Sequence, residues 1–120
     1  MRIVGVAVLV MMAGCVTAMS AQQFYTEFPK ASSTRYLTGA EAIAAKQDGS
    51  CRMIDDHAYN APIGMTVQGD VRAGAEGVDG MVTNDGGNAY RITNFSWLPV
   101  GDGSGATQLR VEFETLSCNR

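Results

Sequence analysis

The chain has 120 residues, of which 46% are hydrophobic and 18% charged, and its formal net charge is −3. These values are typical of one globular domain, and the length excludes two. Because the balance of charge is acidic, the chain has no basic surface for neutralising phosphates, and we do not expect it to bind nucleic acid.

The N-terminal segment has the pattern of a secretory signal. Arg2 precedes an apolar run over residues 3–14, which is twelve residues long, whereas a membrane-spanning helix needs about twenty. A basic start, a short apolar stretch and small residues are typical of a signal peptide, so residues 1–14 are excluded from the fold. Cleavage after Ala18 or Ala21, or an uncleaved apolar helix, is the alternative.

Cys15 follows this segment directly. The sequence Met12-Ala13-Gly14-Cys15 resembles the lipobox of bacterial lipoproteins. The resemblance implies that the Cys15 thiol receives a diacylglyceryl group, that the signal is cut before it, and that the new amino group is acylated, for instance with palmitate. Several acyl chains hold a protein on a membrane durably. Val16 in place of Asp after the cysteine implies, by the same resemblance, an outer-membrane lipoprotein that faces the periplasm.

Two further cysteines, Cys51 and Cys118, predict one disulfide. Two thiols in an oxidising compartment can pair in only one way. A disulfide that closes the loop between Cys51 and Cys118 stabilises the fold by about 4 kcal/mol on the chain-entropy estimate. A zinc site is the alternative, but these cysteines and the single His57 lack the paired spacing of zinc ligands. We therefore predict neither a bound metal nor a cofactor.

Residues 15–33 are polar and small and predict a tether between the anchor and a single domain over residues 34–120. The tether contains Phe24, Tyr25 and Phe28. These aromatic side chains can instead dock on the domain or lie at the lipid interface, and the sequence leaves all three options open.

The domain is expected to begin with a short extended piece and a helix. Thr38 and Glu41 have the spacing of a capping box and are followed by good helix formers, which predicts a helix over about 39–47. A strand is predicted over 51–54. Residues 55–69 have no sustained period, so they are expected to be mainly loop, with room for a short strand over Met65–Val67.

A longer helix is predicted between Asp70, as a plausible N-cap, and the sequence Asn84–Gly87, which supplies a left-handed C-cap. Apolar residues recur at helical spacing within it: Val71, Ala75, Val78 and Val82. Gly74, Gly77 and Gly80 each lower the stability of a helix by about 1 kcal/mol relative to alanine. Their spacing by three places them near one stripe of the helix, where the missing side chains can let the helix lie close to a sheet. An irregular loop is the alternative.

Two C-terminal runs predict a β-hairpin. Residues 90–98 and 108–118 are strand-like and are joined by the turn-rich sequence "PVGDGSGA". Apolar and polar residues alternate in the second run, which indicates a sheet with one buried and one wet face. In the first run the phase of the aromatic residues changes after Ile92, which predicts a β-bulge near Thr93 or Asn94.

The predicted order is strand, helix, strand, loop, helix, strand, strand. This order indicates an α+β domain: a small, mostly antiparallel sheet with one or two helices packed on one face and one disulfide. The phrase "GGNAYRI" over residues 86–92, between a helix and a hairpin that ends in cysteine, resembles small outer-membrane lipoproteins of unknown function. It resembles more loosely the sensor lipoprotein of the Rcs envelope-stress pathway. That sensor has four disulfide cysteines where this chain has two, so no functional residue is carried over.

No motif predicts a reaction, and we predict that the protein is not an enzyme. Asp55, Asp56 and His57 form the most reactive cluster, because carboxylates beside an imidazole can hold a metal or relay a proton. Adjacent residues on a strand nevertheless point to opposite faces. "GDGSGA" over residues 101–106 resembles a dinucleotide loop, but it leads into a strand instead of a helix.

The predicted function is that of a non-enzymatic envelope lipoprotein, of adaptor or sensor type, whose domain binds another envelope protein. Trp97 and Phe95 are the candidates for the interaction surface, because interface anchors are rich in aromatic residues and the change of phase can turn Trp97 outward. One alternative is a periplasmic inhibitor whose "PVGDGSGA" loop enters a hydrolase active site. Another is a metal-binding or enzymatic domain centred on Asp55, Asp56 and His57.

Overall fold

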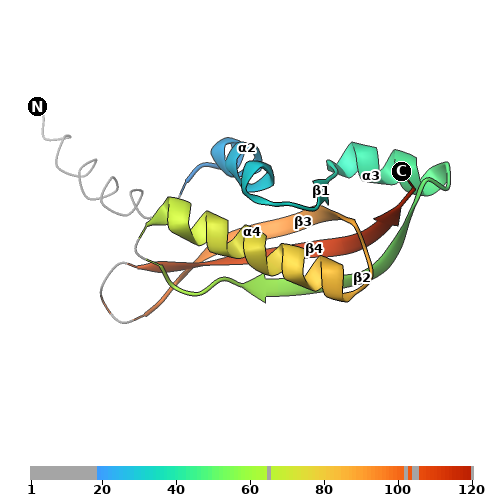
Figure 1. Ribbon diagram of the computed structural model, residues 1–120. Coiled ribbons are helices and arrows are strands. Elements are labelled where there is room, and N and C mark those ends of the chain that lie inside the picture. Colours follow the sequence, from blue (N-terminus) through green and yellow to red (C-terminus); the bar gives the residue numbers. More distant parts are fainter. Residues whose placement is uncertain (1–18, 65, 102, 104–105, 120) are drawn as a thin grey trace, which may run out of the picture.

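A computed structural model describes residues 19–64, 66–101, 103 and 106–119. The elements in this part of the chain are α2 (Ala21–Ala31), β1 (Arg35–Tyr36), α3 (Gly39–Gln47), β2 (Cys51–Asn60), α4 (Val67–Asn84), β3 (Ala89–Pro99) and β4 (Thr107–Cys118), as Figure 1 shows. The predicted α+β class is confirmed. The predicted signal peptide, residues 1–14, and Cys15 lie outside the described residues.

The four strands form one sheet in the order β1-β3-β4-β2. β1 is parallel to β3, and the β3/β4 and β4/β2 pairs are antiparallel. The register of β3 shifts between Ile92 and Asn94, so the predicted bulge is confirmed. Beyond the bulge, Phe95 pairs with Val111 and Trp97 with Leu109. Trp97 therefore lies on the core side of the sheet, and the outward turn considered for it is wrong.

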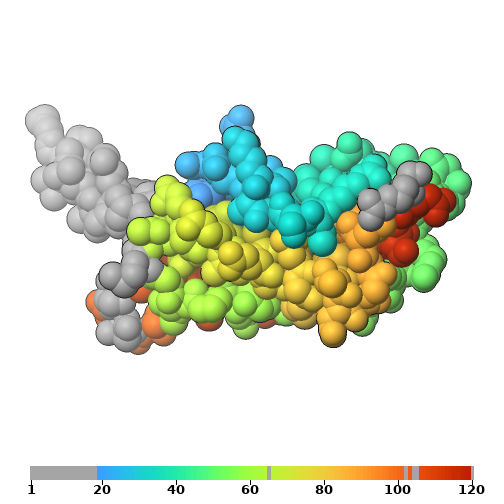
Figure 2. All heavy atoms as spheres, viewed as in Figure 1, coloured from blue at the N-terminus to red at the C-terminus, as the bar shows by residue number. Residues whose placement is uncertain are grey.

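The main core lies between one face of the sheet and the helices α2 and α4. The alternation predicted for β4 is confirmed, because Leu109, Val111 and Phe113 are all completely buried. The helices contribute Phe24 and Phe28 from α2, and the predicted apolar stripe of α4, Val71, Ala75, Val78 and Val82. Figure 2 shows α2, in blue to cyan, lying directly against α4, in yellow.

A second, smaller cluster lies at the other end of the sheet under α3. The capping box that starts α3 is present: the Glu41 amide donates to Thr38 Oγ1 at 3.1 Å and the Thr38 amide donates to Glu41 Oε1 at 2.9 Å. Residues of this cluster alternate along the strands with those of the main core, so α3 packs on the opposite face. They are Leu37, Ala42, Cys51, Ala89, Leu116 and Cys118. The two helices predicted from the sequence, α3 and α4, therefore do not share one face, and that part of the predicted architecture is wrong.

Residues 55–60, expected to be mainly loop, instead continue β2 to Asn60. β2 is an edge strand, so many of its side chains remain exposed and the strand carries no apolar alternation that a sequence pattern can detect. The short strand predicted over Met65–Val67 is not found in its described part, residues 66–67: Thr66 is the N-cap of α4, and its Oγ1 accepts from the Gly69 amide at 2.9 Å. The N-cap predicted at Asp70 is therefore wrong, although Gly86 has the left-handed φ of +83° expected at the C-terminal end.

The tether is shorter than predicted, because residues 21–31 are a helix of the domain. Ser20 caps α2, and the Phe24 and Phe28 side chains are fully buried. Asp79 of α4 holds the segment that follows: its Oδ2 accepts from the Ser33 amide at 2.7 Å and its Oδ1 from the Thr34 amide at 3.0 Å. The aromatic residues of this segment thus dock on the domain, one of the options left open by the sequence.

Two glycines in different surroundings are expected to respond oppositely to alanine. A Cβ at Gly87 would lie 2.5 Å from Thr115 Cγ2 and 2.7 Å from the Leu116 carbonyl oxygen, whereas a Cβ at Gly80 of α4 meets nothing within 4 Å. We expect Gly87→Ala to lower the free energy of unfolding by about 1–3 kcal/mol and Gly80→Ala to raise it by roughly 0.5–1 kcal/mol. Urea unfolding of the two variants tests this, and equal effects would contradict the packing at Gly87.

Candidate functional site

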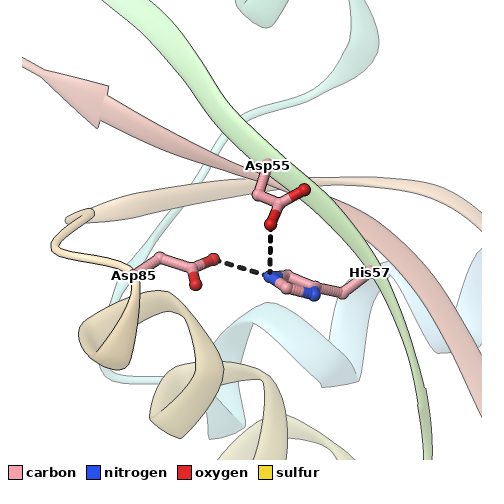
Figure 3. Close-up of side chains that lie close together, drawn as sticks. All are labelled: Asp55, His57 and Asp85. Atoms are coloured by element: carbon pink, nitrogen blue, oxygen red, sulfur yellow. Dashed lines mark hydrogen bonds and ion pairs between the residues drawn. The ribbon is translucent and has the colours of Figure 1, made fainter.

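Asp55, His57 and Asp85 bring three potential ligand atoms together on the face of the sheet that α4 covers (Figure 3). His57 Nε2 lies 2.7 Å from Asp85 Oδ2 and 3.9 Å from Asp55 Oδ2. All three ligand atoms lie within 4.8 Å of one another. This is the one group of its kind in the described part of the chain.

Two elements far apart in sequence position these side chains. Asp55 and His57 are two residues apart on β2, so both point to the same face. Asp85 is the C-cap residue of α4, where its amide donates to the Met81 carbonyl at 3.0 Å. The sharp turn at Gly86 then leads the chain away into β3.

The sequence interpretation placed Asp55, Asp56 and His57 together, and the structure brings only two of them together. Asp56 pairs with Glu114, whose side chain points to the opposite face from Phe113, the partner of His57. Sequence reasoning missed Asp85, which lies 28 residues from His57. The one signal for Asp85 was its place in the helix-ending sequence Asn84–Gly87, which reveals nothing about the strand it meets.

The electrostatics of the site favour a cation. The carboxylate of Asp85 can only accept, so the His57 ring donates the hydrogen bond between them. This bond, followed by the Thr115 hydroxyl, holds the pKa of Asp85 below its ordinary value. The site also lies at the C-terminus of α4, where the helix dipole is negative and stabilises a positive charge.

One imidazole nitrogen and two carboxylate oxygens are ligands that suit a divalent first-row transition ion. The His57 and Asp85 side chains are 22% and 16% exposed and Asp55 is 57% exposed, so the group opens to solvent on one side. Such a group leaves coordination positions for water. Alternatively, the hydrogen bond between His57 and Asp85 has a structural role and holds the C-terminal end of α4 against β2.

A pH dependence follows from the lowered pKa of Asp85. The pKa of this carboxyl is lower in the folded chain than its ordinary value of 3.8. Its ionised form therefore stabilises the fold when the pH is above 3.8, and this stabilisation is lost as the pH falls through the pKa of the folded chain. Asp85→Asn is therefore expected to reduce stability at about pH 5 but to differ less from the natural protein at about pH 2.5. Urea unfolding at both pH values measures this, and it should be repeated in a His57→Ala background, where the difference shrinks. An equal difference at the two pH values would contradict the role of the pair.

Phe95 and Trp97, the predicted interaction surface, are both half-buried against the main core. The Phe95 ring stacks on Phe24 with centroids 3.9 Å apart and an angle of 10° between the planes. Trp97 Nε1 is buried and has no hydrogen-bond partner among the described residues. Whether a partner contacts these two residues stays a prediction.

The disulfide between Cys51 and Cys118 is present, with an S–S distance of 2.06 Å. The β3–β4 connection, which the inhibitor alternative invokes, contains residues 102, 104 and 105, which lie outside the described part of the chain. Its insertion into an active site stays a prediction.

Comparisons with known proteins do not extend these observations. No protein-family model matches the chain, and neither a curated protein nor a solved structure is significantly similar to it. None of the helices among the described residues combines the length and the hydropathy required to cross a bilayer.

Proposed function

We propose that the protein is a non-enzymatic lipoprotein of the bacterial cell envelope, held in the outer membrane through Cys15, whose periplasmic α+β domain binds another envelope protein. The lipobox-like sequence that ends at Cys15 supports the anchor. The Cys51–Cys118 disulfide supports an oxidising compartment. The observation that carries the binding function is the open edge of the sheet at β2.

β2 ends the sheet, and in the described part of the chain no strand pairs with its outer side. An exposed strand edge presents unpaired backbone groups that can pair with a strand of another protein. Next to this edge, Met53 is 48% exposed and Ile43, on the neighbouring helix α3, is 49% exposed. Backbone pairing along β2, with these apolar side chains beside it, is therefore the proposed mode of binding.

The charges on β2 restrict which partner can pair with it. Asp55 and Asp56 are both exposed, and the register of β2 shifts between Met53 and Asp55. Charges and bulges are the usual means by which an edge strand avoids pairing with arbitrary strands. A partner strand that has basic residues opposite Asp55 and Asp56 and follows the irregular register of β2 can still pair with this edge.

Replacing Cys15 with serine tests the anchor. The variant cannot receive the diacylglyceryl group, so we expect the protein to move from the membrane fraction to the soluble fraction of cells. Ala18→Ser, which retains the lipobox, is the matched control and should stay with the membrane. An unchanged membrane fraction for Cys15→Ser contradicts the anchor.

Photo-crosslinking in intact cells tests the binding surface. A photoreactive residue at Ala58 or Met53 on β2 is expected to capture one defined envelope protein, whereas the same residue at Glu76, exposed on α4, is expected to capture none. A probe at Trp97 tests the surface predicted from the sequence. Equal capture from β2 and from Glu76 contradicts recognition along the sheet edge.

Metal binding is a second candidate function, favoured by the convergence of Asp55, His57 and Asp85. Calorimetric titration of the purified protein with Zn²⁺ tests it. Binding that is lost in His57→Ala and in Asp85→Asn but kept in Asp56→Asn supports a site at this position, because Asp56 points to the other face. The absence of Zn²⁺ uptake removes this candidate.

A further inference from the structure

The start of the domain lies close to the proposed anchor. Ser20 caps α2, whose first residue is Ala21, so only five residues, 16–20, separate Cys15 from the helix. An extended chain spans at most about 3.3–3.6 Å per residue, which keeps Ala21 within roughly 20 Å of an acylated cysteine. Because α2 is packed into the core, this short connection restrains the whole domain. This step rests on the proposed lipidation of Cys15.

Figure 1 shows which elements share the end of the molecule where α2 begins. Residues 61–64, the first turn of α4, the end of β3 and the start of β4 all lie there (Figure 1). Met19 lines a surface recess together with side chains of α2 and of the first turns of α4, among them Glu27, Lys30, Gln68 and Arg72. α3 and the C-terminal end of β4 lie at the opposite end, so the domain has one end near the anchor and one far from it.

Two connecting segments at the end near the anchor are almost free of charge, whereas Glu27, Lys30 and Arg72 line the recess beside Met19. The segment 61–69, "APIGMTVQG", has no Asp, Glu, Lys or Arg, and the segment 97–109 has only Asp102. Ile63 is 53% exposed and Leu98 is 38% exposed. Exposed apolar side chains without accompanying charges are suited to the boundary between head groups and acyl chains.

The far end carries an excess of acidic residues. α3, its C-cap Asp48 and the first part of β2 contribute four acidic and two basic side chains: Glu41, Asp48, Asp55, Asp56, Lys46 and Arg52. Without Arg2 the chain retains 8 basic and 12 acidic side chains, a formal charge of −4, so an anionic lipid surface repels the domain on balance. Contact with lipid through the two uncharged segments, with the acidic far end turned away, is the orientation that minimises this repulsion.

We infer that the lipid-facing end of the domain, residues 61–64 and 97–100, rests on the bilayer beside the acylated Cys15, with Ile63 and Leu98 among the lipid head groups. The occupant of this surface is the lipid itself. This orientation points α3 and the Met53 part of β2 into the periplasm, where the proposed partner strand can reach them. The anchor therefore sets the orientation of the binding edge as well as its location.

Spin labels on the complete, acylated protein test the orientation. Cys15 is acylated and the other two cysteines are paired, so a single introduced cysteine is the one reactive thiol. The variants are Ile63→Cys and Leu98→Cys at the lipid-facing end, with Ile43→Cys on α3 as a control of similar exposure. In vesicles of phosphatidylethanolamine and phosphatidylglycerol, we expect the labels at 63 and 98 to lose access to a water-soluble nickel complex and to gain access to oxygen, while the label at 43 is unchanged.

The outcomes separate the orientation from the proposed function. A protein that does not float with the vesicles overturns the anchor itself, whatever the labels report. A protein that floats with labels at 63 and 98 as open to nickel as the label at 43 overturns the lipid-facing end and leaves the anchor intact.

The unlabelled protein provides an independent reading, because Trp97 is the single tryptophan and adjoins Leu98. Its emission is expected to be quenched by lipids brominated on their acyl chains. Quenching should fall in Leu98→Asp, which leaves the anchor and the buried core unchanged. Quenching that is absent from the unlabelled protein in vesicles also overturns the inference.

Discussion

Replacing Phe28 with alanine is expected to lower the free energy of unfolding by about 3–5 kcal/mol, the usual cost of removing a buried aromatic ring. The Phe28 side chain is completely buried. Its ring lies 5.1 Å from that of Phe24 and 6.1 Å from that of Tyr90, measured between centroids. It also approaches Gly74 of α4 closely, where a Cβ would lie 3.4 Å from its Cε2 atom. The cavity left by alanine is bounded by three elements and cannot close easily.

The matched control is Glu27→Ala on the exposed side of the same helix. It changes the helix without touching the core, so the expected effect is within about 0.5 kcal/mol. Urea unfolding followed by circular dichroism measures both variants. If α2 acted as a tether instead of a part of the domain, the two substitutions would have equally small effects, and this outcome would refute the packing of α2.

Removing the disulfide is expected to cost about 4 kcal/mol, because the cross-link closes a long loop in the unfolded chain. Cys51 and Cys118 are 67 residues apart in sequence and face each other across β2 and β4. A domain of this size has a total stability of roughly 5–15 kcal/mol. The double variant Cys51→Ala, Cys118→Ala should therefore unfold at a much lower urea concentration than the natural protein.

The disulfide also has a local role that the experiment can detect. It lies in the small cluster with Leu37, Ala42 and Leu116, under α3. Hydrogen exchange in the double variant is expected to be faster in α3 and the start of β2 than in α4, because α4 packs in the separate main core. Mass spectrometry of the unreduced natural protein provides the control. Two free thiols there, or equal stability of both proteins, would contradict the role of the cross-link.

Together these changes probe opposite ends of the molecule. Phe28 belongs to the main core and the disulfide to the small cluster, and among the described residues no side chain belongs to both clusters. The effects of distant, independent sites add to within a few tenths of a kcal/mol. A triple variant that deviates strongly from additivity would show that the two clusters are coupled through the sheet.

Local patterns in the sequence were sufficient for several elements of the fold. The capping box of α3, the apolar stripe of α4, the alternation in β4 and the bulge in β3 were all predicted and are all present. Each depends on residues a few positions apart, whose spacing reflects the period of one helix or strand. The disulfide was predicted for a different reason, since two cysteines have a single connectivity once Cys15 is assigned to the anchor.

The tertiary structure alone decided the features that join distant segments. Residues 21–31 are part of the domain because the Phe24 and Phe28 side chains pack against α4 and β3. Residues 55–60 form a strand because β4 supplies the backbone partners, although their own side chains show no buried periodicity.

The same division applies to the candidate site. The sequence placed Asp55 and His57 on neighbouring positions, but their contact with Asp85 requires the end of α4 to meet β2 across 28 residues of chain. Short-range patterns report the period of one element, whereas such a contact depends on how whole elements pack. The sequence by itself therefore determined the elements and the cross-link, and packing alone decided which side chains meet.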